Sequence, residues 1–169
     1  MTDINVSLSG FDILNALDNK CNLVLYKNVK NFNSINEMLG PYKKCVLLYH
    51  TKLNYGHWTC LYEVDNTIYF FDSYGFIPDK QLNWVPYNLK DDLNSDYRYL
   101  TKLLYESNKR VEYNEHQFQR RIDGVNTCGR WVVNRLKYPE ISIENYNKLF
   151  KEASKHIDLD ELICDLVKI

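Results

Sequence analysis

The chain has 169 residues, of which 45% are apolar, 14% aromatic and 25% charged, and its formal net charge is −1. This length fits one domain, residues 1–169, with a sizeable core. The aromatic content excludes a disordered chain, and no run approaches the ~20 apolar residues that a membrane span needs. The balance of 21 basic and 22 acidic residues argues against a protein that mainly neutralises nucleic-acid phosphates.

The five cysteines show no CxxC spacing, and their count is odd. Together with a start that lacks a basic-then-apolar leader, this predicts free thiols in a reducing compartment. The same spacing argues against a zinc site, and we expect no cofactor. The excess of 19 Asn and 15 Lys over 2 Ala indicates an AT-rich genome, viral or microbial.

Apolar spacing, caps and turn signals predict a sequence of helices and strands. In chain order these are a helix over 11–17, a strand over 46–50, strands over 57–64 and 67–74, a helix over 96–107, a strand over 110–113, a helix from 128 that stops before Pro139, and helices over 142–153 and 159–167. Strands in the middle and helices at both ends predict an α+β fold with a central mixed or antiparallel sheet flanked by helices.

The two strands around Asp65-Asn66 form a predicted hairpin with a two-residue turn. In that register His57 lies opposite Tyr74, and Asp72 lies opposite Thr59. His57 and Asp72 are then diagonal neighbours on one face, about 7 Å apart at Cα and within side-chain reach. An imidazole beside a carboxylate is how a general base is oriented.

Cys128 is the nucleophile that such a base could activate. It stands at the predicted start of a helix, where the positive end of the helix dipole favours the reactive thiolate. Gly129 removes side-chain bulk beside the sulfur, so that a substrate carbonyl could approach. The backbone N–H of Cys128 and a side-chain amide, from Gln119 or Gln117, are the candidate donors to the oxyanion. Gln119 is preferred because it is nearer the cysteine.

The order of these residues resembles the adenain/SUMO-protease superfamily of cysteine proteases, most closely the adenovirus-type maturation proteases. The resemblance covers about 46–136 and rests on His57-Trp58, Phe70-Phe71-Asp72-Ser73-Tyr74-Gly75-Phe76, Gln119 and Asn126-Thr127-Cys128-Gly129. The chain departs from the family at one point. The family's Gln stands six or seven residues before its Cys, whereas Gln119 stands nine before Cys128.

The resemblance implies a circularly permuted papain-like fold and a peptidase site in which His57 is the base, Asp72 its orienter, Cys128 the nucleophile and Gln119 the oxyanion donor. It also implies cleavage after a small residue such as Gly, in a groove that Trp58, Gly129 and Trp131 would help to form. The implied substrates are viral capsid or core precursors. An activating peptide or DNA is a further possible partner by family analogy. The implied location is the host-cell cytoplasm or viral factory, with packaging in the virion.

Two other functions remain open from the sequence. The first is a deSUMOylase or deubiquitinase acting on ubiquitin-like Gly-Gly termini, although 169 residues leave little room for a broad docking face. The second is a non-catalytic binding module of the same fold, in which Cys128 is an ordinary buried cysteine.

Overall fold

A computed structural model describes residues 3–52 and 55–169 of the chain. The elements in chain order are α1 (Gly10–Ala16), β1 (Asn22–Leu25), the 3₁₀ helix η1 (Tyr26–Asn31), α2 (Ile35–Leu39), β2 (Lys44–Lys52), β3 (Tyr55–Val64), β4 (Thr67–Phe71), the 3₁₀ helices η2 (Lys80–Trp84) and η3 (Tyr87–Leu89), α3 (Tyr99–Glu106), β5 (Arg110–Tyr113), α4 (Cys128–Lys137), α5 (Ile143–Ala153) and α6 (Leu159–Leu166).

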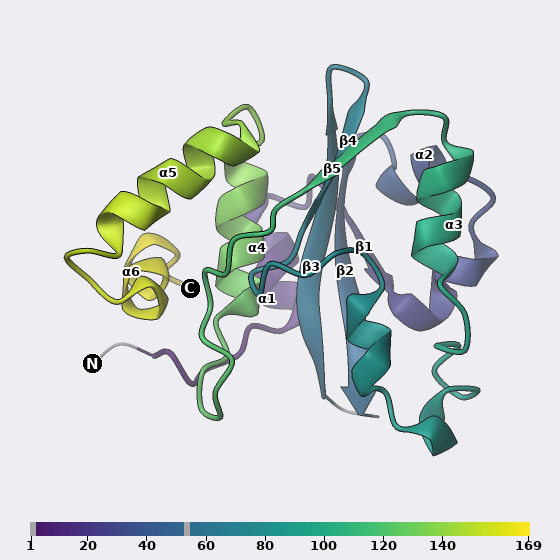
Figure 1. Ribbon diagram of the computed structural model, residues 1–169, viewed down its shortest axis with the longest axis horizontal. Coiled ribbons are helices and arrows are strands. Elements are labelled where there is room, and N and C mark those ends of the chain that lie inside the picture. Colours follow the sequence, from purple (N-terminus) through teal and green to yellow (C-terminus); the bar gives the residue numbers. More distant parts are fainter. Residues whose placement is uncertain (1–2, 53–54) are drawn as a thin grey trace.

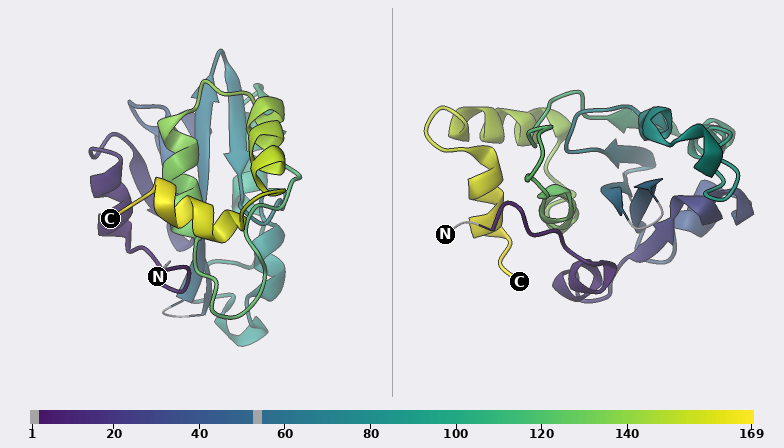
Figure 2. Two further views of the ribbon diagram at one scale, coloured as in Figure 1. Left: turned by 90° about the vertical axis from the view of Figure 1, so that its left-hand side faces the viewer. Right: turned by 90° about the horizontal axis from the view of Figure 1, so that it is seen from below.

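The strands form one mixed sheet in the order β1-β2-β3-β4-β5. The central pairs β2–β3 and β3–β4 are antiparallel, whereas the outer pairs β1–β2 and β4–β5 are parallel. Helices cover both faces, with α1, α4, α5 and α6 on one side of the strands and α2 and α3 on the other (Figures 1 and 2). The predicted α+β class with a mixed, helix-flanked sheet is therefore confirmed.

Two buried clusters occupy the two faces of the sheet. Alternate residues of each strand divide between them, as the two-residue period of a strand requires. On β3, Trp58, Cys60 and Tyr62 pack into the cluster that contains α4 and α5. Leu61 points to the opposite cluster, which the side chains of α2 and α3 complete. Trp58, which follows His57, therefore packs on the face of the sheet that α4 covers.

The predicted hairpin is confirmed, with one correction. Asp65 and Asn66 adopt positive φ angles of 50° and 63°, which two-residue hairpin turns require, and Val64 pairs with Thr67. Pairing continues only to Cys60 opposite Phe71, so β4 ends before Asp72 and the predicted strand pairs beyond it do not form. Asp72 nevertheless reaches β3 through the bond of its carboxylate to His57, and Asn114, just after β5, bonds to its backbone from the other side.

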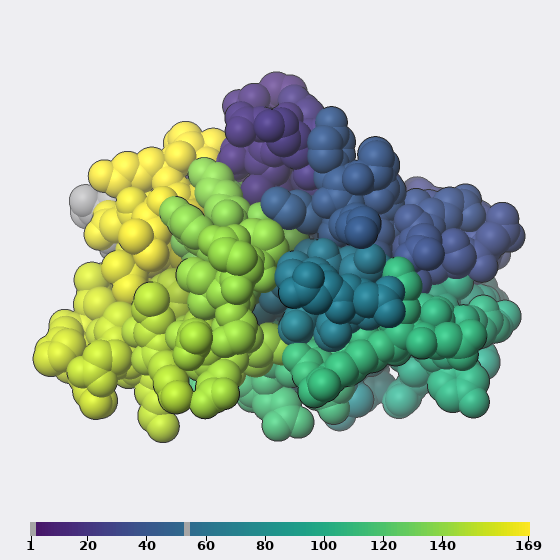
Figure 3. Space-filling view, turned by 90° about the horizontal axis from the view of Figure 1, so that it is seen from above, coloured from purple at the N-terminus to yellow at the C-terminus, as the bar shows by residue number. Residues whose placement is uncertain are grey.

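The remaining predicted elements agree with the structure to within a few residues, and Ser9 caps α1 in a full capping box with Asp12. β1 and α2 were not predicted from the sequence. The turn of the β3–β4 hairpin lies at one end of the sheet, near the centre of the face in Figure 3. In the part of the chain that the structure describes, no helix is long and apolar enough to cross a membrane.

Candidate active site

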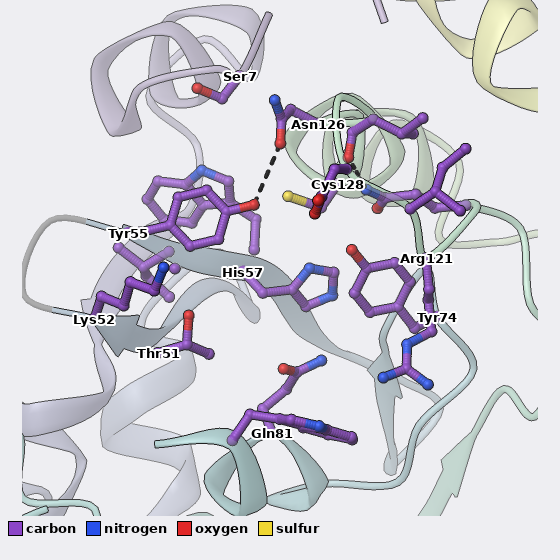
Figure 4. A pocket seen from close by; sticks show the side chains of 18 of the residues that line it. Ser7, Thr51, Lys52, Tyr55, His57, Tyr74, Gln81, Arg121, Asn126 and Cys128 are labelled. Atoms are coloured by element: carbon purple, nitrogen blue, oxygen red, sulfur yellow. Dashed lines mark hydrogen bonds between the residues drawn. The ribbon is translucent and has the colours of Figure 1, made fainter. Parts of the chain in front are cut away.

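A pocket of about 900 Å³ opens at the end of the sheet opposite the hairpin turn. His57, near the start of β3, and Cys128, the first residue of α4, both line it. They meet because α4 packs along β3, which brings the N-terminus of the helix to the start of the strand. Figure 4 shows the sulfur of Cys128 and the ring of His57 in the same hollow.

His57 and Asp72 form a buried ion pair. Nε2 of His57 lies 2.8 Å from Oδ1 of Asp72, and the aspartate has no exposed surface. The same carboxylate accepts the backbone N–H of Tyr74 at 2.8 Å and Nε2 of Gln81 at 3.3 Å. Since Nε2 of His57 is engaged by Asp72, Nδ1 is the ring nitrogen left for proton transfer with a thiol.

The surroundings raise the pKa of His57 to about 10. Burial alone lowers this pKa, but the charge and hydrogen bonding of Asp72 and Cys128 raise it by more. The imidazole is therefore charged at neutral pH. A buried imidazolium beside a cysteine sulfur is the arrangement that favours a thiolate nucleophile.

The candidate oxyanion donor is also in the pocket. Gln119 is buried and lines the pocket, and Ser73 Oγ donates to its Oε1 at 2.7 Å. Its Nε2 donates one hydrogen to the carbonyl of Val125 at 3.2 Å, which leaves the second for a ligand. Gln117 is exposed, and it donates instead to the backbone of Gln119. Of the two glutamines left open by the sequence, the structure places Gln119 with Cys128 and His57.

Of the three residues predicted to form the substrate groove, Trp58, Gly129 and Trp131, only Trp58 lines the pocket. Trp58 is largely buried and donates its indole N–H to the carbonyl of Leu8 at 3.0 Å. Trp131 is a correction, because it has no exposed surface and packs in the core against Phe118 and Phe150.

Gly129 is a second correction. It does not line the pocket, and a Cβ built there would lie 3.0 Å from Cβ of Leu8 and 3.3 Å from Cδ1 of Ile13. The glycine therefore lets α4 approach the N-terminal part of the chain closely. Access of a substrate carbonyl to Cys128 is not its role.

Several residues without a predicted role complete the site. Tyr74 stacks on His57, and Asn114 and Gln81 bond to Asp72. Asn126, two residues before Cys128, binds the N-terminal segment, since its backbone N–H donates to Ile4 at 2.7 Å and its side chain to Asn5 at 2.8 Å. The predicted hairpin register already placed Tyr74 opposite His57. The contacts of Asn114 and Asn126 join segments far apart in the chain, which no local pattern reveals, whereas Gln81 bonds to Asp72 only nine residues before it.

Fold and site together define an α+β protein with a buried Cys-His-Asp constellation. A scan of family models gave no match to the chain. The chain is 43% identical over 161 residues to the uncharacterized protein V9 of the Sputnik virophage, an alignment that covers 94% of this chain and 92% of V9. The chain therefore belongs to the same family as this virophage protein.

ChlaDub1 from Chlamydia trachomatis is a solved structure with a weak resemblance to the chain. It aligns over 95% of this chain and 80% of its own, with 16% identity and a TM-score of 0.31. A likeness of this size does not define the fold or its chemistry.

Proposed function

We propose that the chain is a cysteine peptidase, with Cys128 as the nucleophile, His57 as the general base and acid, and Asp72 as the group that orients His57. The observation that carries the proposal is that Cys128, from α4, and His57, from β3, line one pocket, while the fully buried Asp72, from the turn after β4, bonds to His57. In this proposal the chain has the adenain-like connectivity that its residue order resembles.

The reaction follows from these positions. The thiolate of Cys128 attacks the substrate carbonyl carbon, and the oxyanion is bound by the N–H of Cys128 and the free amide hydrogen of Gln119. The N–H of Cys128 is open to a ligand, because the first turn of a helix has no internal carbonyl partners. Collapse of this intermediate breaks the peptide bond, and the leaving amine takes a proton from His57. His57 then takes a proton from a water molecule, the hydroxide adds to the acyl-enzyme, and the Cys128 sulfur leaves as the thiolate, which releases the carboxylic acid and restores the thiolate–imidazolium pair.

The proposed biological role is the maturation of viral capsid or core precursor proteins. Membership in a family with a virophage protein supports a viral setting. In this role the enzyme would act in the host-cell cytoplasm or viral factory and be packaged in the virion. Cleavage after small residues, and activation by a peptide or DNA, belong to the same proposal.

The proposal is tested by incubating the purified chain with the capsid precursors of its own virus, with and without DNA and virion peptides. We expect mass spectrometry to find defined cleavages that Cys128→Ala and His57→Ala abolish. Cys164→Ala is the matched control, because it removes another buried thiol on α6, outside the pocket. Precursors that remain intact under all conditions would contradict the maturation role.

Electrophilic probes built on ubiquitin and SUMO test the main alternative. Rapid labelling of Cys128 by such a probe, with no precursor cleavage, would favour a protease of ubiquitin-like termini. Precursor cleavage that Cys128→Ala leaves unchanged would come from another enzyme, and the chain would then be a binding module of this fold.

A further inference from the structure

Arg121 lies on the loop between Gln119 and Cys128, and three aromatic rings hold its guanidinium. The guanidinium carbon is 4.6 Å from the ring centre of Phe76, 5.0 Å from that of Trp84 and 5.6 Å from that of Tyr74. Phe76 and Trp84 also stack on each other, with centroids 5.2 Å apart. Aromatic faces fix the plane of an arginine but leave the N–H groups at its edge free.

Among the residues that the structure describes, no carboxylate forms an ion pair with this arginine. Across residues 3–52 and 55–169, Arg121 makes no ion pair and donates no side-chain hydrogen bond, although it lines the pocket together with Asp123. The four remaining residues of the chain include no Asp or Glu. Its neighbour Arg120 differs, because Asp158 and Asp160 both bind it. Arg121 is thus a cation that aromatic rings hold in place and that no carboxylate of the described residues pairs with.

The position of Arg121 relative to the reacting atoms limits what it can bind. The Tyr74 ring contacts both His57 and Arg121. Its centre is 4.3 Å from the centre of the His57 ring and 5.6 Å from the guanidinium carbon of Arg121. The guanidinium carbon is therefore at most about 10 Å from the centre of the imidazole. An extended peptide covers this distance in about three residues. Figure 4 shows Arg121 beside Tyr74 at the edge of the pocket, with Lys52 across it.

We propose that Arg121 is a specificity-determining residue that binds an Asp or Glu side chain of the substrate within three residues of the scissile bond. This inference rests on the proposed peptidase function, which supplies the scissile bond. Binding of the acidic side chain by Arg121 can be measured separately from cleavage. A planar guanidinium binds a carboxylate through two parallel N–H···O bonds, and its aromatic cage holds it ready for this contact. The substrate class is therefore an acidic peptide segment.

The test uses a proteome-derived peptide library, with cleavage sites read by mass spectrometry, and a parallel binding assay on Cys128→Ala. We expect Asp and Glu to be enriched about tenfold over Asn and Gln at one position within three residues of the cut. Arg121→Gln should abolish this preference, and Arg121→Glu should replace it by a preference for Lys and Arg. Lys52→Glu is the matched control, because it makes the same charge change across the pocket and should keep the preference.

Each outcome distinguishes the two proposals. Cleavage without acidic enrichment, or enrichment that Arg121→Gln and Arg121→Glu leave intact, would overturn the role of Arg121 and leave the peptidase standing. Acidic peptides that bind Cys128→Ala through Arg121 but are never cut by the wild type would overturn the peptidase and keep the recognition site. A library that is neither cut nor bound would overturn both.

Discussion

The ring of Tyr74 lies flat against the imidazole of His57, with ring centroids 4.3 Å apart and planes 7° from parallel. The backbone N–H of the same tyrosine donates to Oδ1 of Asp72 at 2.8 Å. One residue therefore holds both the plane of the imidazole and the carboxylate that orients it. An aromatic face also stabilises a cation, so the stack favours the charged form of His57.

The stack can be tested by comparing Tyr74→Leu with Tyr74→Phe. A contact of this kind is worth about 0.5–2 kcal/mol, so we expect Tyr74→Leu to lower kcat/KM by about 2- to 30-fold. Loss of the stack should also lower the pKa of His57 and move the alkaline limb of the pH profile to lower pH. Tyr74→Phe keeps the ring and should keep both properties. If the two variants change equally, the hydroxyl and not the stacked ring is responsible.

The raised pKa of His57 predicts how stability depends on pH. Its value of about 10 in the folded chain exceeds the ordinary 6.5, so the charged imidazole favours folding. This contribution is fully present below about pH 6.5, declines as the pH rises, and is lost above about pH 10. We therefore expect the difference in free energy of unfolding between the wild type and His57→Gln to shrink between these values, as measured by urea unfolding.

His50 offers the control for that measurement. Burial lowers the pKa of His50, the opposite direction from His57. Its contribution therefore changes only below pH 6.5, and the difference between the wild type and His50→Gln should stay constant from pH 6.5 to 10. A constant difference for His57→Gln over the same range would show that the imidazole is not held in its charged form.

Thiol labelling should separate Cys128 from the other cysteines. Cys21 and Cys164 are about as exposed as Cys128, at 7%, 9% and 7%, so accessibility alone does not distinguish the three. Burial raises the pKa of the Cys21 and Cys164 thiols, whereas Cys128 faces a charged imidazole. We expect iodoacetamide at pH 7 to modify Cys128 first, as read by peptide mapping.

The same labelling tests the role of His57. Its replacement by Ala removes the imidazolium and should slow the alkylation of Cys128 to the rate of the other thiols. A rate unchanged by His57→Ala, or equal labelling of Cys128 and Cys21 in the wild type, would contradict a nucleophile activated by His57.

The hairpin shows how much of the site the sequence could predict. The Asp65-Asn66 turn sets a register by local chemistry, and the register brings His57 towards the segment that carries Asp72. The extent of the ladder was not predictable, because β4 ends where Asn114, 42 residues further along the chain, bonds to the backbone of Asp72. Local signals therefore located the pair, and a distant residue determined its geometry.

The roles of α4 residues were harder to predict than the helix itself. Its bounds follow from apolar spacing and from Pro139, but which face meets the pocket depends on how the helix packs. Trp131 and Gly129 face the core and the N-terminal segment, and only Cys128, at the first position, reaches the pocket. The aromatic contacts of Arg121 could not be predicted either, because the three rings belong to residues 37 to 47 positions earlier in the chain.

Gly75 is expected to hold the turn that carries Asp72 in place. Its φ of +79° disfavours any residue with a side chain, and a Cβ there would lie 2.8 Å from the carbonyl oxygen of Glu115 and 2.9 Å from the backbone of His116. We therefore expect Gly75→Ala to lower the free energy of unfolding by more than the ~1–2 kcal/mol cost of the left-handed conformation. Peptidase activity should also fall, because the clash displaces the carboxylate from His57.

Gly124→Ala separates these two effects on stability. Gly124 has a similar φ of +85°, but its added Cβ would meet nothing within 4 Å in the described part of the chain. It should therefore show the conformational cost alone, about 1–2 kcal/mol in urea unfolding. Equal destabilisation by the two variants would mean that the backbone of residues 115–116 moves away from the added Cβ at no cost in free energy. The turn after β4 would then not be what fixes Asp72 beside His57.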